Sequence, residues 1–204
     1  MSWPTWSRYQ TNPGAIKLST NRAYQGDRSL YIDPNNYTQN DVVINDQTVN
    51  DSPYEVRLNT WVWFDNSAQN PVGMVFWYED PDNFHYLSLL DPSNDDNIGI
   101  SEVDSGTETE LDRTNEDPNL DQSEFINLRF TVWEASNHVN GRIEVYEPNN
   151  STWRVIHPDY GDFTVAIPSD TSGGGVGLIA QSADGTTPAN NNLYIDNTRI
   201  LTPP

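Results

Sequence analysis

The sequence predicts an all-β protein, built either as a β-sandwich or as a β-barrel. Most segments alternate apolar and polar residues with a period of two, and almost none has the 3.6-residue period of an amphipathic helix. Turn residues separate these segments at regular intervals. The 7 Trp, 10 Tyr and 6 Phe fall mostly within the alternating segments, as in a folded sheet protein. Together these observations favour a sandwich or a barrel.

Twelve segments have the strand pattern. In chain order they are Arg28–Asp33, Asp41–Asn45, Tyr54–Phe64, Val72–Glu79, Asn83–Leu90, Ile98–Val103, Thr107–Asp112, Phe125–Glu134, Gly141–Glu147, Trp153–His157, Gly174–Ala180 and Leu193–Leu201. The turn signals between them are Asp33–Asn36, Asp80–Asn83, Asp91–Asn94, Asp104–Gly106, Asn140–Gly141 and Glu147–Asn150. No segment has the composition of a flexible linker. We therefore expect an N-terminal arm, residues 1–14, followed by a single domain, residues 15–204.

Alternation within the strands assigns their two faces. The positions expected in the core are Tyr54, Val56, Leu58, Thr60, Val62, Phe64, Ile126, Leu128, Phe130, Val132, Ile143 and Val145. Those expected on the opposite, outward face include Arg57, Trp61, Trp63, Arg129, Trp133, Arg142, Glu144 and Tyr146. The segment Val72–Glu79 is apolar on both faces, which is typical of a central strand, and we expect its Trp77 to share the outward face. The predicted outward surface mixes aromatic rings with arginines.

The charge of the chain excludes several classes of function. It has 30 Asp and Glu against 10 Lys and Arg, which gives a net charge of −20, and Lys17 is its one lysine. Nucleic-acid interfaces need patches of Lys and Arg, so we expect no nucleic-acid partner. No apolar run reaches the roughly 20 residues of a membrane-spanning helix, so we expect no membrane insertion. The absence of cysteine excludes disulfides and thiol catalysis.

The acidic excess also suggests an environment. A lysine-poor, aspartate-rich surface suits molar salt, where screening weakens the self-repulsion of a highly charged chain. We interpret the source as a halophile and expect the fold to need salt; the alternative is an ordinary acidic protein from moderate salt. The sequence starts without the pattern of a signal peptide, which we interpret as a mature start.

The order of several segments resembles a known family. The segments are Gly26–Ile32, Tyr54–Leu58, Gly73–Tyr78 followed by Asp82–Leu87, Leu128–Val132 followed by Arg142–Tyr146, and Gly175–Leu178 followed by Tyr194–Ile200. They resemble, in this order, the strands of concanavalin A-like (laminin-G-like) jelly rolls, over roughly residues 26–200. The resemblance implies a two-sheet antiparallel β-sandwich, the concanavalin A-like jelly roll. Members of this superfamily bind glycans, hydrolyse glycans or mediate adhesion and assembly, so the fold does not fix the function.

The resemblance also implies a structural calcium ion, held between Asp27 and Asp196. Hard oxygen ligands of this kind suit Ca²⁺. Further candidate ligands are Asp82, Asp95 and Asp96, in predicted loops. The alternative is that these carboxylates are simply solvated, as most are in so acidic a chain.

One acidic segment resembles a catalytic motif. Retaining family-16 glucanases on this fold place carboxylates as Glu-x-Asp-x-(x)-Glu on one strand face, and Glu102–Glu108 looks similar. It has too many residues before its last glutamate, and Ser105-Gly106 predicts a hairpin turn. We therefore expect a solvated hairpin and no catalytic residue. His85 lies in a predicted strand and is more typical of a packed side chain than of a general base.

The outward face is the stronger candidate site. Sugar rings offer apolar C–H faces and many hydroxyls, so their sites combine aromatic platforms with bidentate donors and carboxylates. The candidates for glycan binding or for an interface are Arg57, Trp61, Trp63, Trp77, Arg129, Trp133, Arg142, Glu144 and Tyr146. The alternative is that these aromatic rings pack under a loop or against a partner chain.

Three functions stay open. The first is a non-enzymatic, lectin-like surface or assembly protein: a virion decoration, turret or tail adhesin module that contacts host cell-surface glycans in high salt. Its partners would be further copies of itself or other virion or surface proteins. It would be located on the virion surface or outside the cell. The second is a glycoside hydrolase or lyase acting on polysaccharide. The third is a purely structural module without a ligand.

Overall fold

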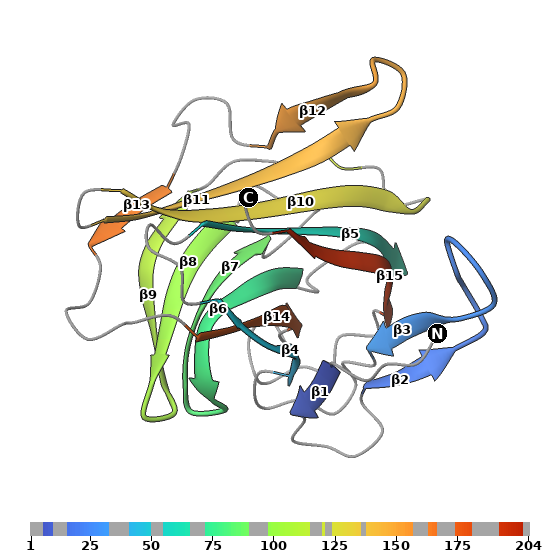
Figure 1. The fold of residues 1–204 in the computed structure, drawn as a ribbon. Helices are drawn as coiled ribbons and strands as arrows, with labels where there is room; N and C mark the ends of the chain where they lie inside the picture. Colours follow the sequence, from blue (N-terminus) through green and yellow to red (C-terminus); the bar gives the residue numbers. More distant parts are fainter. Residues whose placement is uncertain are drawn as a thin grey trace.

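The computed structural model describes residues 6–9, 16–32, 41–49, 55–65, 72–89, 98–114, 120, 124–135, 138–156, 163–166, 174–180 and 192–201. These residues form two antiparallel sheets that pack face to face, so the predicted all-β sandwich is confirmed (Figure 1). None of the described segments is a helix long and apolar enough to span a membrane.

The first sheet has seven strands. Their order is β1 (Trp6–Tyr9), β4 (Asp41–Val49), β14 (Gly174–Ala180), β6 (Val72–Asp80), β7 (Asn83–Leu89), β8 (Ile98–Asp104) and β9 (Thr107–Thr114). The second sheet has eight strands. Their order is β12 (Thr152–Val155), β11 (His138–Glu147), β10 (Ile126–Ala135), β5 (Glu55–Asp65), β15 (Asn192–Leu201), β3 (Ser29–Ile32) and β2 (Ile16–Ser19), and β13 (Phe163–Ala166) pairs with β11. Figure 1 shows β6 to β9 curving beneath the flatter β5, β10 and β11.

All twelve predicted strands are present, with shifted ends, and three further strands were not predicted. These are β1, β2 and β13, each of four residues. A segment this short holds too few alternations to stand out from a loop. Residues 6–9 of the predicted N-terminal arm form β1, which pairs with β4 in the first sheet.

The core lies between the sheets and is built by alternation. Val56, Leu58, Val62 and Phe64 of β5 are at most 2% exposed, and the predicted core positions of β10 and β11 are also buried. They pack against Met74, Phe76, Leu87, Leu89, Ile98 and Ile100 of the first sheet in one apolar cluster. The face assignment of β5, β10 and β11 is therefore confirmed for the described residues; Tyr54 lies outside them.

Trp77 is not on the outward face. It is 3% exposed and packs into the main core, where its ring meets those of Phe76 and His85 edge-on, with centroids 5.4 and 5.3 Å apart. The prediction was wrong because β6 carries an irregularity after Phe76 and Trp77 adopts a φ of 49°. This left-handed conformation breaks the alternation, so both Phe76 and Trp77 point into the core. β6 also belongs to the first sheet, away from the other candidate residues.

The predicted turn at Asn140-Gly141 is also wrong, because both residues lie inside β11. A Cβ atom on Gly141 would come within 3.0 Å of Ile100 Cδ1 and 3.2 Å of Leu87 Cδ1. The glycine therefore allows close packing between the sheets, which is the other common reason for a glycine within a strand.

The predicted turns Asp80–Asn83, Asp104–Gly106 and Glu147–Asn150 all join strands in the structure. Ser105 and Gly106 have φ values of 50° and 76°, as expected for a two-residue hairpin turn between β8 and β9. The turns predicted at Asp33–Asn36 and Asp91–Asn94 lie outside the described residues.

Candidate functional site

Strand register places the predicted aromatic and charged side chains together on the outer face of the second sheet. Residues that pair across neighbouring strands form five rows on this face. The first two rows are Lys17, Tyr31, Tyr194 and Trp63, and then Asp196, Trp61 and Asn127. The other three are Arg199, Asn59, Arg129 and Glu144; Leu201, Arg57, Thr131 and Arg142; and Glu55, Trp133 and Asn140. We call these residues, with Tyr146, Trp153 and the residues of the 20–28 segment that pack on them, the outer face of the second sheet.

The segment 20–28 crosses part of this face. Tyr24 stacks on Trp61 with ring centroids 3.6 Å apart and an interplanar angle of 11°. The Arg22 guanidinium lies 4.2 Å from the centroid of the Trp63 ring. Trp61 and Trp63 therefore support a second layer, and the more exposed ring is Tyr24, at 39%.

Asp196 holds this segment in place. Its Oδ2 accepts hydrogen bonds from the backbone N–H of Tyr24 and of Gln25, both at 2.8 Å. Its Oδ1 accepts the backbone N–H of Asn197 at 2.7 Å. Asn197 has a φ of 48°, which asparagine tolerates better than most residues, at a register shift between β15 and β5. Buried Thr60 supports this bulge through a 2.8 Å hydrogen bond with Thr198 Oγ1.

A second aromatic group lies at the β10–β12 side of the face. The Arg129 guanidinium lies 3.7 Å from the centroid of the Trp153 ring, and Tyr146 packs against Trp153 at 5.4 Å. Arg129 also forms a 3.3 Å ion pair with Glu144, and both side chains are largely buried. The Trp153 ring is therefore fixed between an arginine and a tyrosine.

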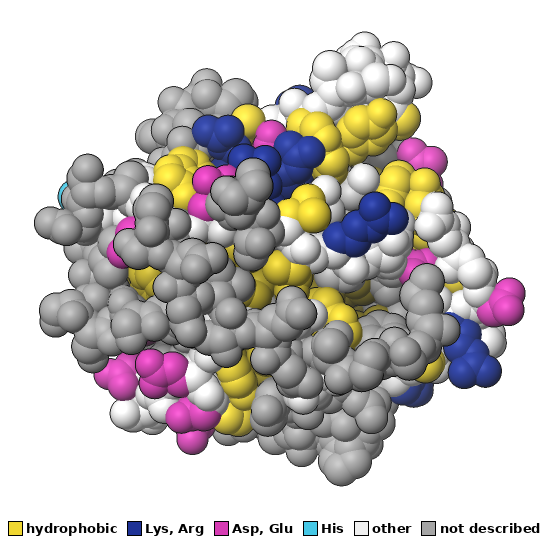
Figure 2. All heavy atoms as spheres, viewed as in Figure 1, with side chains coloured by type: hydrophobic (Ala, Val, Ile, Leu, Met, Phe, Trp, Pro, Cys, Tyr) yellow, Lys and Arg dark blue, Asp and Glu magenta, His cyan; other side chains and the backbone are white. Residues whose placement is uncertain are grey.

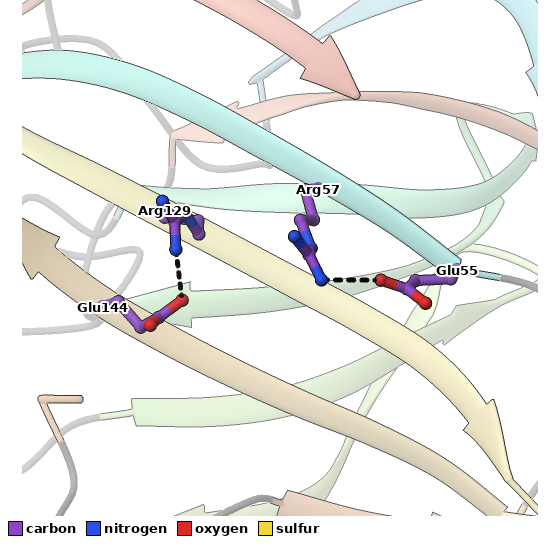
Figure 3. A network of polar contacts seen from close by, with 4 residues as sticks. All are labelled: Glu55, Arg57, Arg129 and Glu144. Carbon is purple, nitrogen blue, oxygen red and sulfur yellow. Dashed lines mark hydrogen bonds and ion pairs between the residues drawn. The ribbon is translucent and has the colours of Figure 1, made fainter. Parts of the chain in front are cut away.

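The remaining predicted arginines lie further along the same face. Arg57 pairs with Glu55 at 2.9 Å, and its side chain is 50% exposed. Arg142 lies 5.4 Å from the centroid of the Trp133 ring. Figure 3 shows that Glu55, Arg57, Arg129 and Glu144 project from the same side of β5, β10 and β11. In Figure 2 dark blue side chains gather among yellow ones in the upper part of the view, where Figure 1 places these strands.

Two amide oxygens lie between the aromatic groups. Asn59 Oδ1 and Asn127 Oδ1 are buried and have no hydrogen-bond donor within the structure. An acceptor left without a donor costs about 1–3 kcal/mol. A hydroxyl group from water or from a ligand would therefore be favourable beside either side chain.

At the β11–β12 edge, Glu147 Oε1 accepts a 2.7 Å hydrogen bond from Arg154 Nε. Asn150 Nδ2 donates to Glu147 Oε2 at 3.2 Å. The hydrogen bond from Arg154, with help from Asn150, lowers the pKa of Glu147 below its usual 4.5.

Eight of the nine candidate residues therefore share one face, and Trp77 is the exception. Sequence reasoning missed Arg22, Tyr24 and Trp153 as members of the face. Trp153 could have been found, because it lies in a predicted strand and pairs with Tyr146 in register. Arg22 and Tyr24 had no local signal, since their placement depends on Asp196, far away in the sequence.

The calcium ion implied by Asp27 and Asp196 stays a prediction. Both lone pairs of Asp196 Oδ2 already accept N–H groups, which leaves one free lone pair, on Oδ1. The described part of the chain contains no group of three or more His, Cys, Asp or Glu side chains able to hold a metal ion. Asp27 is exposed in the 20–28 segment, Asp82 lies in the β6–β7 turn, and Asp95 and Asp96 lie outside the described residues. The residues that the structure describes thus fit backbone capping better than metal binding.

The acidic segment Glu102–Glu108 forms a hairpin, as predicted. Glu102 contacts the buried His85, whose Nε2 lies 3.4 Å from Glu102 Oε1. Glu108 accepts a hydrogen bond from the Tyr86 hydroxyl at 2.5 Å. His85 and Tyr86 are neighbours in β7 and point to opposite faces. The two glutamates therefore lie on opposite faces of the first sheet and do not form a pair of catalytic carboxylates.

The outer face of the first sheet is different in kind. Its apolar residues form a separate cluster, and all of them are buried: Val42, Ile44, Val75, Tyr78, Phe84, Tyr86, Val103 and Ile179. Its three aromatic rings are at most 8% exposed. These rings are not available to a ligand in this structure. On the outer face of the second sheet Tyr31 and Tyr194 are also buried, but Tyr24, Trp61, Trp63, Trp133, Tyr146 and Trp153 are at least partly exposed.

Comparison with known proteins identifies the fold. No family model matches the sequence, and no curated protein matches it. Solved structures do match it. The carbohydrate-binding module CBM66 from Bacillus subtilis superposes with a TM-score of 0.59 at 7% identity, over 97% of this chain and 96% of that one. A legume lectin-like domain from Entamoeba histolytica gives 0.57 at 10% identity, over 97% and 89%. Arcelin-5, a lectin-like defense protein from Phaseolus vulgaris, gives 0.54 at 9% identity, over 96% and 97%.

This chain has a lectin-like fold. The matches span nearly its whole length, so the likeness includes both sheets. At these identities the likeness concerns the backbone, and the side chains of the outer face must be judged by their own chemistry.

Proposed function

We propose that this protein is a non-enzymatic carbohydrate-binding module, and that it binds glycans on the outer face of its second sheet. The observation that carries the proposal is the arrangement of rings and arginines on that face. Tyr24 on Trp61 and Trp153 beside Arg129 are two fixed aromatic groups, and β10 and β11 lie between the strands of Trp61 and Trp153. Carbohydrate-binding and lectin-like proteins among the structural matches support the proposal at a coarse level.

The face suits a sugar because its rings are already in position. Stacking on Trp61, and the hydrogen bonds that the backbone N–H groups of Tyr24 and Gln25 donate to Asp196, hold Tyr24 before any ligand arrives. Arg129 and Tyr146 hold Trp153 in the same way. Side chains that are already fixed lose little conformational entropy when a ligand binds, so more of the contact energy appears as affinity.

The carboxylates of this face serve as partners of arginine. Glu144 is paired with Arg129 and Glu55 with Arg57, and neither is near a second carboxylate in register. A retaining glycosidase needs two carboxyl groups about 5–5.5 Å apart. The pairing therefore supports binding rather than hydrolysis. Turnover of a polysaccharide that is lost in both Glu102→Gln and Glu144→Gln would support the hydrolase alternative instead.

Within this proposal the module works at a virion or cell surface in high salt, as a decoration, turret or tail adhesin module. There it would contact host glycans beside further copies of itself or other surface proteins. The support for this setting is the net charge of −20 with a single lysine, since salt screens the self-repulsion of such a chain.

The test is a glycan array in molar salt, followed by titration of the best ligand with variants. We expect Tyr24→Leu and Trp153→Leu each to lower the affinity about tenfold, which corresponds to about 1.4 kcal/mol of lost stacking. Tyr24→Phe keeps the ring and should bind like the parent. Leu18→Ala, at an exposed apolar residue of β2, controls for general loss of apolar surface and should also bind normally.

Two outcomes contradict the proposal. If the parent protein binds no glycan on the array, the chain is better explained as a structural module. If it binds a glycan and neither Tyr24→Leu nor Trp153→Leu weakens that binding, the ligand lies elsewhere on the molecule.

A further inference from the structure

The basic residues of this chain are not spread evenly. Six of its 10 Lys and Arg lie on the outer face of the second sheet, and these are Lys17, Arg22, Arg57, Arg129, Arg142 and Arg199. Among the side chains that the structure describes, the carboxylates in the rows of the same face are Glu55, Glu144 and Asp196. The rows hold five of these positive charges against three negative ones, a balance of +2, and Arg22 adds a sixth positive charge over the Trp63 ring, on a molecule of net charge −20.

The carboxylates of the face are each occupied. Glu55 and Glu144 contact one guanidinium nitrogen each, Arg57 Nη2 and Arg129 Nη1. Asp196 accepts three backbone N–H groups. A guanidinium has five N–H donors in a planar fork, so Arg57 and Arg129 keep donors beyond the one that each pair uses.

Arg199 strengthens the pattern. It lies opposite Asn59 in register, in the same row as Arg129 on the other side of β5, and it is exposed. It has no ion-pair partner among the described residues. Uncompensated arginine in so acidic a protein is unlike a random distribution of surface charge. The planar fork of N–H donors on its guanidinium matches two oxygens of an anionic group such as carboxylate or sulfate.

We infer that the outer face of the second sheet selects glycans that carry carboxylate or sulfate groups, such as polyuronates or sulfated polysaccharides. This inference rests on the proposed function, because the aromatic rings provide the platforms for the sugar. Arg57, Arg129 and Arg199 then bind the anionic substituents. Charges on other faces repel such a ligand weakly, because screening reduces interactions beyond about 8 Å at an ionic strength of about 0.15 M.

The test compares ligands that differ only in charge. Polygalacturonate oligomers are compared with their fully methyl-esterified, neutral form, and dextran sulfate with dextran, at constant ionic strength. We expect at least tenfold tighter binding of one or both charged forms. The uronate and sulfate arms distinguish which anion the face takes.

Matched arginine variants locate the effect. Arg57→Gln and Arg199→Gln should each weaken binding of the charged ligand about fivefold to tenfold, as expected for loss of a charge-assisted hydrogen bond. Arg113→Gln is the control. Arg113 lies on β9 of the first sheet, is 43% exposed and pairs with Glu110 at 2.7 Å, much as Arg57 pairs with Glu55. Its variant should bind like the parent.

The outcomes separate this inference from the proposed function. Equal binding of the charged and neutral forms, with Tyr24→Leu still harmful, overturns the selection of anions and leaves glycan binding intact. Failure to bind any glycan overturns both. Equally tight, arginine-dependent binding of single-stranded DNA, or arginine-dependent self-association of the protein, also overturns it, since the face would then recognise polyanions or a second copy of the chain.

Discussion

At the scale of single residues, Asp196 connects the fold to the site. It lies in β15, yet its carboxylate caps the backbone of a segment that the sequence places 171 and 172 residues away. Through Tyr24 this segment stacks on Trp61 of the face and meets the Phe125 ring edge-on, with centroids 6.0 Å apart. The resemblance to jelly rolls implies that Asp196 is a calcium ligand, which stays a prediction, and the structure shows its carboxylate accepting three backbone N–H groups. The sequence predicted that Asp196 has a structural role. It did not predict that Tyr24 and Gln25 are its partners, because they are distant in sequence.

Replacing Asp196 tests this role. We expect Asp196→Ala to lower the free energy of unfolding by about 1–3 kcal/mol, because the backbone N–H groups of Tyr24, Gln25 and Asn197 lose a charged hydrogen-bond acceptor. Asp27→Ala, in the same segment, should change it by less than about 0.5 kcal/mol. Urea unfolding with calcium and with a chelator measures both. Equal losses in the two variants, present only with calcium, would show instead that the two aspartates hold a metal ion.

Glu147 gives a prediction about pH. Its pKa is lowered by the hydrogen bond from Arg154, so its contribution to stability is complete above the ordinary value of 4.5 and is lost as the pH falls through the lowered pKa. Thermal unfolding between about pH 7 and pH 3 should therefore show a smaller decrease for Glu147→Gln than for the parent. Glu79→Gln, at an exposed residue of β6, should follow the parent curve. Identical curves for the parent and Glu147→Gln would contradict this.

At the scale of elements, alternation predicted regular strands and failed where a strand is irregular. β5, β10 and β11 keep a strict period of two, so their core and outer residues were assigned correctly. β6 does not. Its Trp77 has a left-handed backbone conformation and packs directly against Gly174 of β14. A Cβ atom on Gly174 would lie only 2.7 Å from the Trp77 Cα, so a larger residue would not fit there. The bulge thus depends on a glycine of β14, far away in sequence, and a pattern within β6 could not reveal it.

The segments between strands set a second limit on prediction. The hairpin at Ser105-Gly106 follows from local turn chemistry and was predicted. The position of segment 20–28 follows from tertiary contacts and was not. The alternative in which aromatic rings pack beneath a loop therefore holds for Trp61 and Trp63, and the loop itself brings Tyr24 and Arg22 to the surface.

At the scale of the whole molecule, the two sheets present different outer faces. The first sheet buries its outer aromatic rings, and the second leaves rings and arginines partly exposed. The sequence was sufficient to predict the sandwich and most of the arginine–aromatic face, because both depend on alternation within strands. It could not show which sheet Trp77 belongs to, nor that six of the ten basic residues gather on one face.

The most direct test of a glycan-binding face on the second sheet is an NMR titration of the tryptophan indole N–H signals with a bound glycan. Single Trp→Phe variants assign the signals of the seven tryptophans. We predict that the signals of Trp61, Trp63 and Trp153 shift on saturation, while that of Trp77, buried in the core, stays in place. A shift confined to Trp77, or saturation with no shift at Trp61, Trp63 and Trp153, would place the ligand elsewhere and contradict the account.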